Sequence, residues 1–174
     1  MGEDTPDGRS VLTIVPVEKL QKNINKTIKG LTAKGIPGVY VCFNRPQRAA
    51  NASLEKEGID STKVFFIDCI ATSLGNSSGK AENTVHVQSP ADLTSLRIAI
   101  DEFIEKIPGR KFLVIDALAT LLIYNSEELV LKFVKSIIER TAGSGLQTFV
   151  LTPDTKGGEL INKVSLFFDE VKKE

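Results

Sequence analysis

The sequence contains a single histidine, two cysteines and no tryptophan. One histidine, His86, excludes a multi-histidine metal site, and no cysteines or histidines have the spacing of metal ligands. Cys42 and Cys69 both lie inside apolar runs, a placement typical of buried free thiols in a reducing compartment. The sequence therefore predicts a cytoplasmic protein without a metal site built from these residues.

Net charge is also lacking, because 22 basic residues balance 22 acidic ones. No overall electric field draws the chain to nucleic acid or anionic lipid, so neither is expected as a partner. Apolar runs reach about 5 to 8 residues, whereas a membrane-spanning helix needs roughly 20. The first residues, MGEDTPDGRS, are acidic and have no apolar core, which excludes a secretory signal.

Strand-like and helix-like segments alternate along the chain after an irregular tail at residues 1–9. Apolar, β-branched runs predict strands at 10–15, 38–43, 63–70, 84–88, 111–116 and 145–152. Helical spacing of apolar residues predicts helices at 16–34, 46–57, 89–107 and 125–138. The last segment, 160–171, fits either one helix or a helix followed by an edge strand. The alternation predicts one three-layer α/β/α domain over residues 10–174, with a doubly wound, mostly parallel sheet.

Local residue types also predict where helices begin and end. Ser89 before Pro90 predicts an N-cap, and Asn125 with Glu128 predicts a capping box for the next helix. Gly58 stands where a helix end requires a left-handed residue.

Polar residues follow the apolar strands at their carboxyl ends, where open α/β sheets bind ligands. These candidate ligand-binding residues are Asn44, Arg45, Asp68, Asp116, Thr152 and Asp154. Each also has a structural interpretation. Asp68 and Asp116 fit acids that cap backbone amides, Thr152 and Asp154 fit a turn at Pro153, and Arg45 fits an ion pair with Asp68.

Several segments together resemble the RecA-like ATPase core of KaiC-type proteins. They are GVYVCFNRP, the following helix with Asn51 that ends in Gly58-Ile59-Asp60, KVFFIDCI, and KFLVIDALATLL. The resemblance extends over roughly residues 10–170 and is to the shortened relatives of KaiC, common in archaea, that lack the phosphate loop. It implies a RecA-like fold in which Asp116 occupies the Walker B position. The acid at that position holds the magnesium of bound ATP.

The chain departs from the ATPases of this family at two places. Their first strand leads into G-x-x-x-x-G-K-[ST], whose backbone N–H groups bind phosphate. Here VPVEKLQKN follows the strand, and no glycine lies between Gly8 and Gly30. The ATPases also carry paired glutamates at the positions of Asn44 and Arg45, and one of them activates water. Neither an amide nor a guanidinium acts as a base near neutral pH.

A second segment, GNSSGK at residues 75–80, imitates half a phosphate loop. It is one residue short, and Ala81 stands where serine or threonine would bind magnesium. A strand pattern follows it where the motif requires a helix. We interpret this segment as a surface loop.

These departures predict a non-catalytic RecA/KaiC-like domain that acts as a binding or regulatory module, without ATP hydrolysis and without a cofactor. Asp116 is expected to hold a metal only if a nucleotide–magnesium complex binds. The alternative is a module that binds a small anion or nucleotide in the crevice at the strand ends. Lys19, Lys22, Lys26 and Lys29 fit a solvated helix face but also offer a basic stripe to an acidic partner.

Self-association or a protein partner is expected from the apolar surface of two segments. GVYVCF has no proline or charge to discourage edge pairing and is predicted to form one sheet edge. Leu166, Phe167 and Phe168 place more apolar surface near the C-terminus than one helix face buries. We expect the contact at one of these two places.

Overall fold

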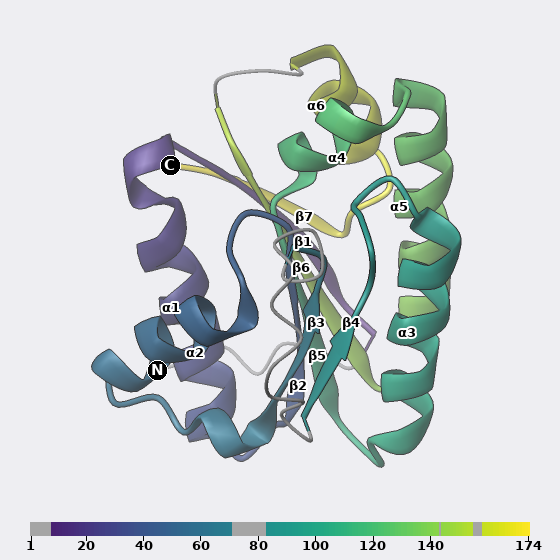
Figure 1. The fold of residues 1–174 in the computed structure, drawn as a ribbon. Coiled ribbons are helices and arrows are strands. Elements are labelled where there is room, and N and C mark those ends of the chain that lie inside the picture. The colour runs from purple at the N-terminus through teal and green to yellow at the C-terminus, as the bar shows by residue number, and fades with distance from the viewer. Residues whose placement is uncertain (1–7, 71–82, 143, 155–157) are drawn as a thin grey trace.

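The computed structural model describes residues 8–70, 83–142, 144–154 and 158–174. Its centre is one sheet of seven strands, all parallel, in the order β4-β3-β2-β5-β6-β1-β7. The strands are β1 Ser10–Val15, β2 Gly38–Cys42, β3 Val64–Asp68, β4 Thr84–His86, β5 Lys111–Asp116, β6 Leu146–Pro153 and β7 Glu170–Lys173. The predicted fold class is confirmed, since the sheet is a parallel one with helices on both faces (Figure 1).

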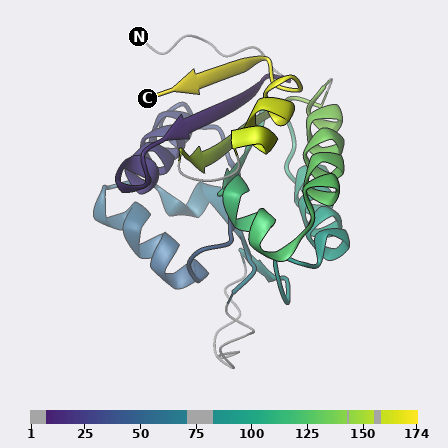
Figure 2. The same ribbon diagram turned by 90° about the horizontal axis from the view of Figure 1, so that it is seen from above.

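Helices cover the two faces of the sheet unequally. The helices are α1 Leu20–Ala33, α2 Gln47–Lys56, α3 Leu93–Lys106, α4 Leu118–Tyr124, α5 Glu127–Thr141 and α6 Gly158–Ser165. The apolar residues of α1 and α2 form one core with the sheet, and those of α3 to α6 form a second core on the other face. Figure 2 shows the two layers on either side of the strands.

The order of the strands creates two positions where neighbouring strands continue into helices on opposite faces. Strand β2 leads to α2 and its neighbour β5 leads to α4, across the sheet. Likewise β1 leads to α1 and its neighbour β6 leads to α6. At such switch positions the connections diverge, which leaves a crevice at the carboxyl ends of the strands.

The prediction that GVYVCF forms a sheet edge is wrong. Strand β2 lies between β3 and β5, and all of its residues are buried. The absence of charge and proline that suggested an open edge is what a central strand covered on both faces requires. The edges are β4 and the charged strand β7, so the last segment is a helix followed by an edge strand.

The apolar residues near the C-terminus are mostly buried. Phe168 belongs to the core, and Phe167 packs against it. Only Leu166 stays in solvent, with 85% of its surface exposed. The fold therefore buries most of the apolar surface that suggested an interface here.

Both predicted N-caps are displaced, the first by three residues and the second by one. Helix α3 begins after Asp92, whose side chain accepts a hydrogen bond from Ser95 N. Helix α5 begins after Ser126, while Asn125 donates to the carbonyl oxygens of Pro90 and Leu121. Gly58 has the predicted left-handed conformation, with φ of 72°. In the described part of the chain, no helix has the length and apolar character of a bilayer crossing.

Candidate functional site

The largest group of predicted site residues lies at the switch position between β2 and β5. Asn44 follows β2, and Asp116 ends β5. Asn44 Nδ2 donates to Asp116 Oδ1 at 3.3 Å, and the Tyr40 hydroxyl donates to Asp116 Oδ2 at 2.9 Å. Both carboxylate oxygens therefore have a partner from strand β2 or from the residues that follow it.

Helix α4 completes this network from the other face of the sheet. Thr120 Oγ1 donates to Asn44 Oδ1 at 2.6 Å, so the Asn44 amide receives one hydrogen bond and donates another. This pairing fixes the orientation of the Asn44 amide, because its oxygen can only accept a hydrogen bond and its nitrogen can only donate one. The chain Tyr40–Asp116–Asn44–Thr120 thus connects β2, β5 and α4 with every member bonded; we call it the Asp116 network.

Burial controls the electrostatics of this network. Only 2% of Asp116 is exposed, and this burial raises the pKa of its carboxyl group. The hydrogen bonds from Tyr40 and Asn44 and the positive charge of Arg45 act in the opposite direction. The pKa of Tyr40 is raised well above its ordinary value, by burial first and then by the charge of Asp116. Tyr40 therefore remains a protonated donor.

Arg45 lies next to this network. Within the residues that the structure describes, its guanidinium has neither an ion pair nor a hydrogen bond, and it is half-buried. Its charge acts instead on Asp116 and on the thiol of Cys42. The expected ion pair with Asp68 is not among these interactions.

Asp68 lies on the far side of β2 from Asp116, since both are in register with Cys42. Its Oδ2 accepts from Gln47 N at 2.7 Å, and its Oδ1 accepts from Ile70 N at 2.8 Å. The carboxylate thus caps the first turn of α2, where the helix dipole favours negative charge. Asp68 therefore caps backbone amides, which is the structural interpretation given to it from the sequence.

The thiols of Cys42, which lies between Asp68 and Asp116, and of Cys69, which follows Asp68, are buried. Cys42 and Cys69 are free and buried, as predicted. Burial, followed by the nearby carboxylates, raises the pKa of Cys42 well above its ordinary value and that of Cys69 to about 12. Neither thiol is therefore activated as a nucleophile. Among the described residues, no group of histidine, cysteine and acidic side chains is arranged to hold a metal ion.

The connection from β1 to α1 lies at the second switch position of the sheet, beside the end of β6. It is a single 3₁₀ turn, Val17–Lys19, that begins at Pro16. Lys19 N donates to Pro16 O at 2.9 Å, and Leu20 N donates to Val17 O. These two amides are therefore engaged within the turn, and Pro16 has no N–H to offer. The imitation motif at 75–80 lies outside the described residues.

The remaining two candidates lie at the end of β6. Leu151 belongs to the core under α1 and α2, so its neighbour Thr152 faces the other side of the sheet from Asp116. Thr152 is fully buried, and no described residue bonds its hydroxyl oxygen. Asp154 is exposed, and its backbone N–H donates to Val15 O at 3.0 Å. The structure thus joins Asn44 directly to Asp116, with Arg45 nearby, but separates Thr152 from that cluster.

Sequence reasoning missed Tyr40 and Thr120. Tyr40 has the only side-chain hydroxyl in strand β2, and strand alternation places it on the same face as Cys42. That position was the available signal. Thr120 had none, because its contact depends on how α4 folds back over the strand ends.

Comparisons with known proteins agree with this architecture. Residues 8–171 match the model of a family described as "Family of unknown function (DUF7504)". The chain is also similar to the crystal structure of the KaiC-like protein PH0186 from the hyperthermophilic archaeon Pyrococcus horikoshii OT3. The TM-score is 0.66 at 18% identity, covering 95% of this chain and 70% of that one. At this identity the likeness shows a shared RecA/KaiC-like fold. A search of curated proteins found no match.

Proposed function

We propose a function for this chain, which belongs to the family of unknown function DUF7504: it is a non-catalytic interaction module built on a KaiC-like fold. The observation that carries the proposal is the closure of the Asp116 network. The carboxylate that would bind magnesium is buried, and both of its oxygens accept hydrogen bonds from side chains. A magnesium ion keeps several waters and prefers accessible oxygen ligands, which this site does not provide.

The surroundings of Asp116 support the same conclusion. Asn44 and Arg45 cannot take a proton from an attacking water, and Asn44 is already held by Thr120. The turn after β1 contains Pro16 and Glu18 where phosphate-binding loops have glycines, and Glu18 adds a negative charge. Losing three charge-assisted hydrogen bonds at ~1.5–3 kcal/mol each forfeits roughly 4 to 9 kcal/mol of nucleotide affinity.

The purified protein is therefore expected neither to bind ATP–magnesium below millimolar concentration nor to hydrolyse it. Isothermal calorimetry and a phosphate-release assay check the two parts. A micromolar Kd for ATP would contradict this prediction. It would favour the second candidate function, an anion-binding crevice. The supporting observation is the half-buried Arg45, which has no ion pair or hydrogen bond with a described residue. In that case Arg45→Gln should abolish binding, while the exposed Arg48→Gln should leave it unchanged.

An apolar surface next to the site supports an interaction role. Ile123 and Tyr124 end α4 with 76% and 50% of their surface exposed, and Leu129 in the first turn of α5 is 51% exposed. We call these three residues the α4–α5 corner. Helix α4 follows directly from Asp116, so the corner belongs to the end of the molecule that carries the candidate site (Figure 1). Exposed apolar side chains this close in the sequence are candidates for an interface.

A second copy of the chain is the occupant that we propose for this corner. The chain has no net charge, so two copies do not repel each other at long range. Light scattering at tens of micromolar is expected to give at least twice the mass of 19.0 kDa. Ile123→Glu should reduce this mass to that of one chain, because the interface would then bury a charge.

Ile98→Glu is the matched control, since Ile98 is 54% exposed on α3 and lies outside the corner. It should leave the assembly unchanged. If the wild-type chain is monomeric at this concentration and Ile123→Glu changes nothing, self-association is excluded, and a different protein would have to cover the corner.

A further inference from the structure

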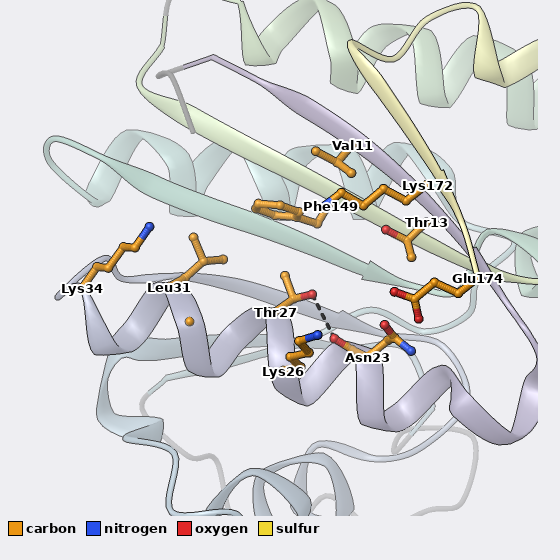
Figure 3. A pocket seen from close by; sticks show the side chains of 11 residues that line it. Val11, Thr13, Asn23, Lys26, Thr27, Leu31, Lys34, Phe149, Lys172 and Glu174 are labelled. Carbon is orange, nitrogen blue, oxygen red and sulfur yellow. Dashed lines mark hydrogen bonds between the residues drawn. The ribbon is translucent and has the colours of Figure 1, made fainter. Parts of the chain in front are cut away.

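The face of the sheet that carries α1 and α2 is incompletely covered. Among the described elements, two helices pack on this face and four on the other, although both faces have the same seven strands. Beyond α1, strands β1 and β7 extend the sheet toward its edge (Figure 2). The result is a groove of about 270 Å³ between α1 and these strands (Figure 3). Parallel sheets normally have both faces covered, and this volume is near the lower end of small-molecule sites.

The floor of the groove is apolar. Val11 of β1, Phe149 of β6 and Leu31 of α1 line it, and Figure 3 shows the Phe149 ring among these side chains. Phe149 is only partly buried against the core of this face, so part of its ring remains available to a ligand. An aromatic ring of this kind offers a large contact surface to an apolar or aromatic group.

The rim of the groove is predominantly basic. Lys26 comes from α1, Lys34 directly follows that helix, and Lys172 comes from β7. Among the described residues that line the groove, Glu174 is the one acid. Within the described part of the chain, Lys26 and Lys34 have no ion pair, and Lys172 Nζ lies 3.9 Å from Glu170 Oε1. Two of the three ammonium groups are therefore uncompensated in a concave site, where they attract an anion.

Glu174 and Lys34 lie at opposite ends of the groove. Helix α1 runs back along the sheet after β1, so Lys34 lies toward the start of β1 and β7. Glu174 follows the end of β7 and lies at the other end. A bound anion would place its charge on the basic rim, away from Glu174.

Gly30 supplies an independent observation. It lies in the interior of α1, where glycine destabilises a helix relative to alanine. No tight packing requires it, since a Cβ at this position would meet no atom within 4 Å. Gly30 also lines the groove. Any larger side chain there would project into the open space, so the glycine keeps the groove free at the expense of helix stability.

We propose that this groove binds a small organic anion. The apolar or aromatic body of the ligand would rest on Phe149 and Leu31, and its carboxylate, sulfonate or phosphate would lie among Lys26, Lys34 and Lys172. The site is separate from the Asp116 network and does not depend on the interaction role.

The experiment titrates the full chain with 8-anilinonaphthalene-1-sulfonate and follows its fluorescence. Its neutral analogue N-phenyl-1-naphthylamine tests whether the charge is recognised. Gly30→Phe fills the groove with the least disturbance to the fold, and its melting temperature should not fall. This variant should weaken binding of the sulfonate by about tenfold or more.

The lysine variants test the rim. Lys26→Ala and Lys34→Ala should each weaken binding by about two- to fivefold, the effect of one exposed charge pair. Lys29→Ala, an exposed lysine of α1 outside the groove, should have no effect. The neutral analogue should bind about tenfold more weakly than the sulfonate. Equal binding to Gly30→Phe and wild type, or equal affinity for the charged and neutral dyes, would overturn the proposal.

Discussion

Asp116→Ala is expected to lower the free energy of unfolding by about 2–4 kcal/mol. The substitution leaves the hydroxyl of Tyr40 buried without an acceptor and also removes the bond to Asn44. An unsatisfied buried donor costs about 1–3 kcal/mol, and the missing carboxyl group leaves a small void. Urea denaturation measures the change.

Asp116→Asn tests the same contact with a neutral side chain of equal size. A shift of about 1–3 kcal/mol is expected, because the amide must place its N–H₂ group against one of two donors. A double-mutant cycle compares Tyr40→Phe, Asp116→Ala and the two changes combined. Removing both partners should lower the free energy of unfolding by less than the sum of the two single changes. Loss of self-association in Asp116→Asn with stability intact would instead mean that this acid contacts a partner.

The raised pKa of Asp116 adds a pH dependence of defined sign. The folded state binds the proton more tightly than the unfolded state, in which the pKa is about 4. The contribution of Asp116 to stability is therefore fully present at low pH and is lost as pH rises through the folded-state pKa. Wild type should lose stability relative to Asp116→Asn over this window. A difference between the two that is independent of pH would contradict burial as the dominant cause.

Gly38→Ala is expected to destabilise the protein by at least about 3 kcal/mol, which lowers the melting temperature by roughly 6–12 °C for a chain of this size. A Cβ at Gly38 would overlap both the ring and the backbone carbonyl oxygen of Phe112. The ring could turn away only within a filled core, and the carbonyl belongs to the neighbouring strand in register with Gly38. Differential scanning calorimetry gives both quantities.

Gly30→Ala is the matched control for this prediction, because it adds the same methyl group where nothing lies within 4 Å. It should stabilise the protein by about 0.5–1 kcal/mol through its higher helix propensity. A mild effect of Gly38→Ala, similar to that of Gly30→Ala, would mean that β2 and β5 can separate at Gly38. The packing described for the centre of the sheet would then be wrong.

The sequence by itself determined the class of fold and most of its elements. The alternation of β-branched runs with helical spacing predicted the layers, because these periods depend on neighbouring residues and on which faces are buried. The position of Asp116 at a strand end was predicted for the same reason. The caps at Ser89 and Asn125 were misplaced, since the residues Asp92 and Ser126 compete locally for the same role.

Only the tertiary structure decided which strands are neighbours and what each polar group contacts. GVYVCF became the centre of the sheet rather than an edge, because an apolar run suits either place until its partners are known. Tyr40 reaches Asp116 across 76 positions of sequence, and the groove combines residues of α1 with others near both ends of the chain. Such contacts arise from long-range packing, in which the choice among neighbours depends on the free energy of the whole core.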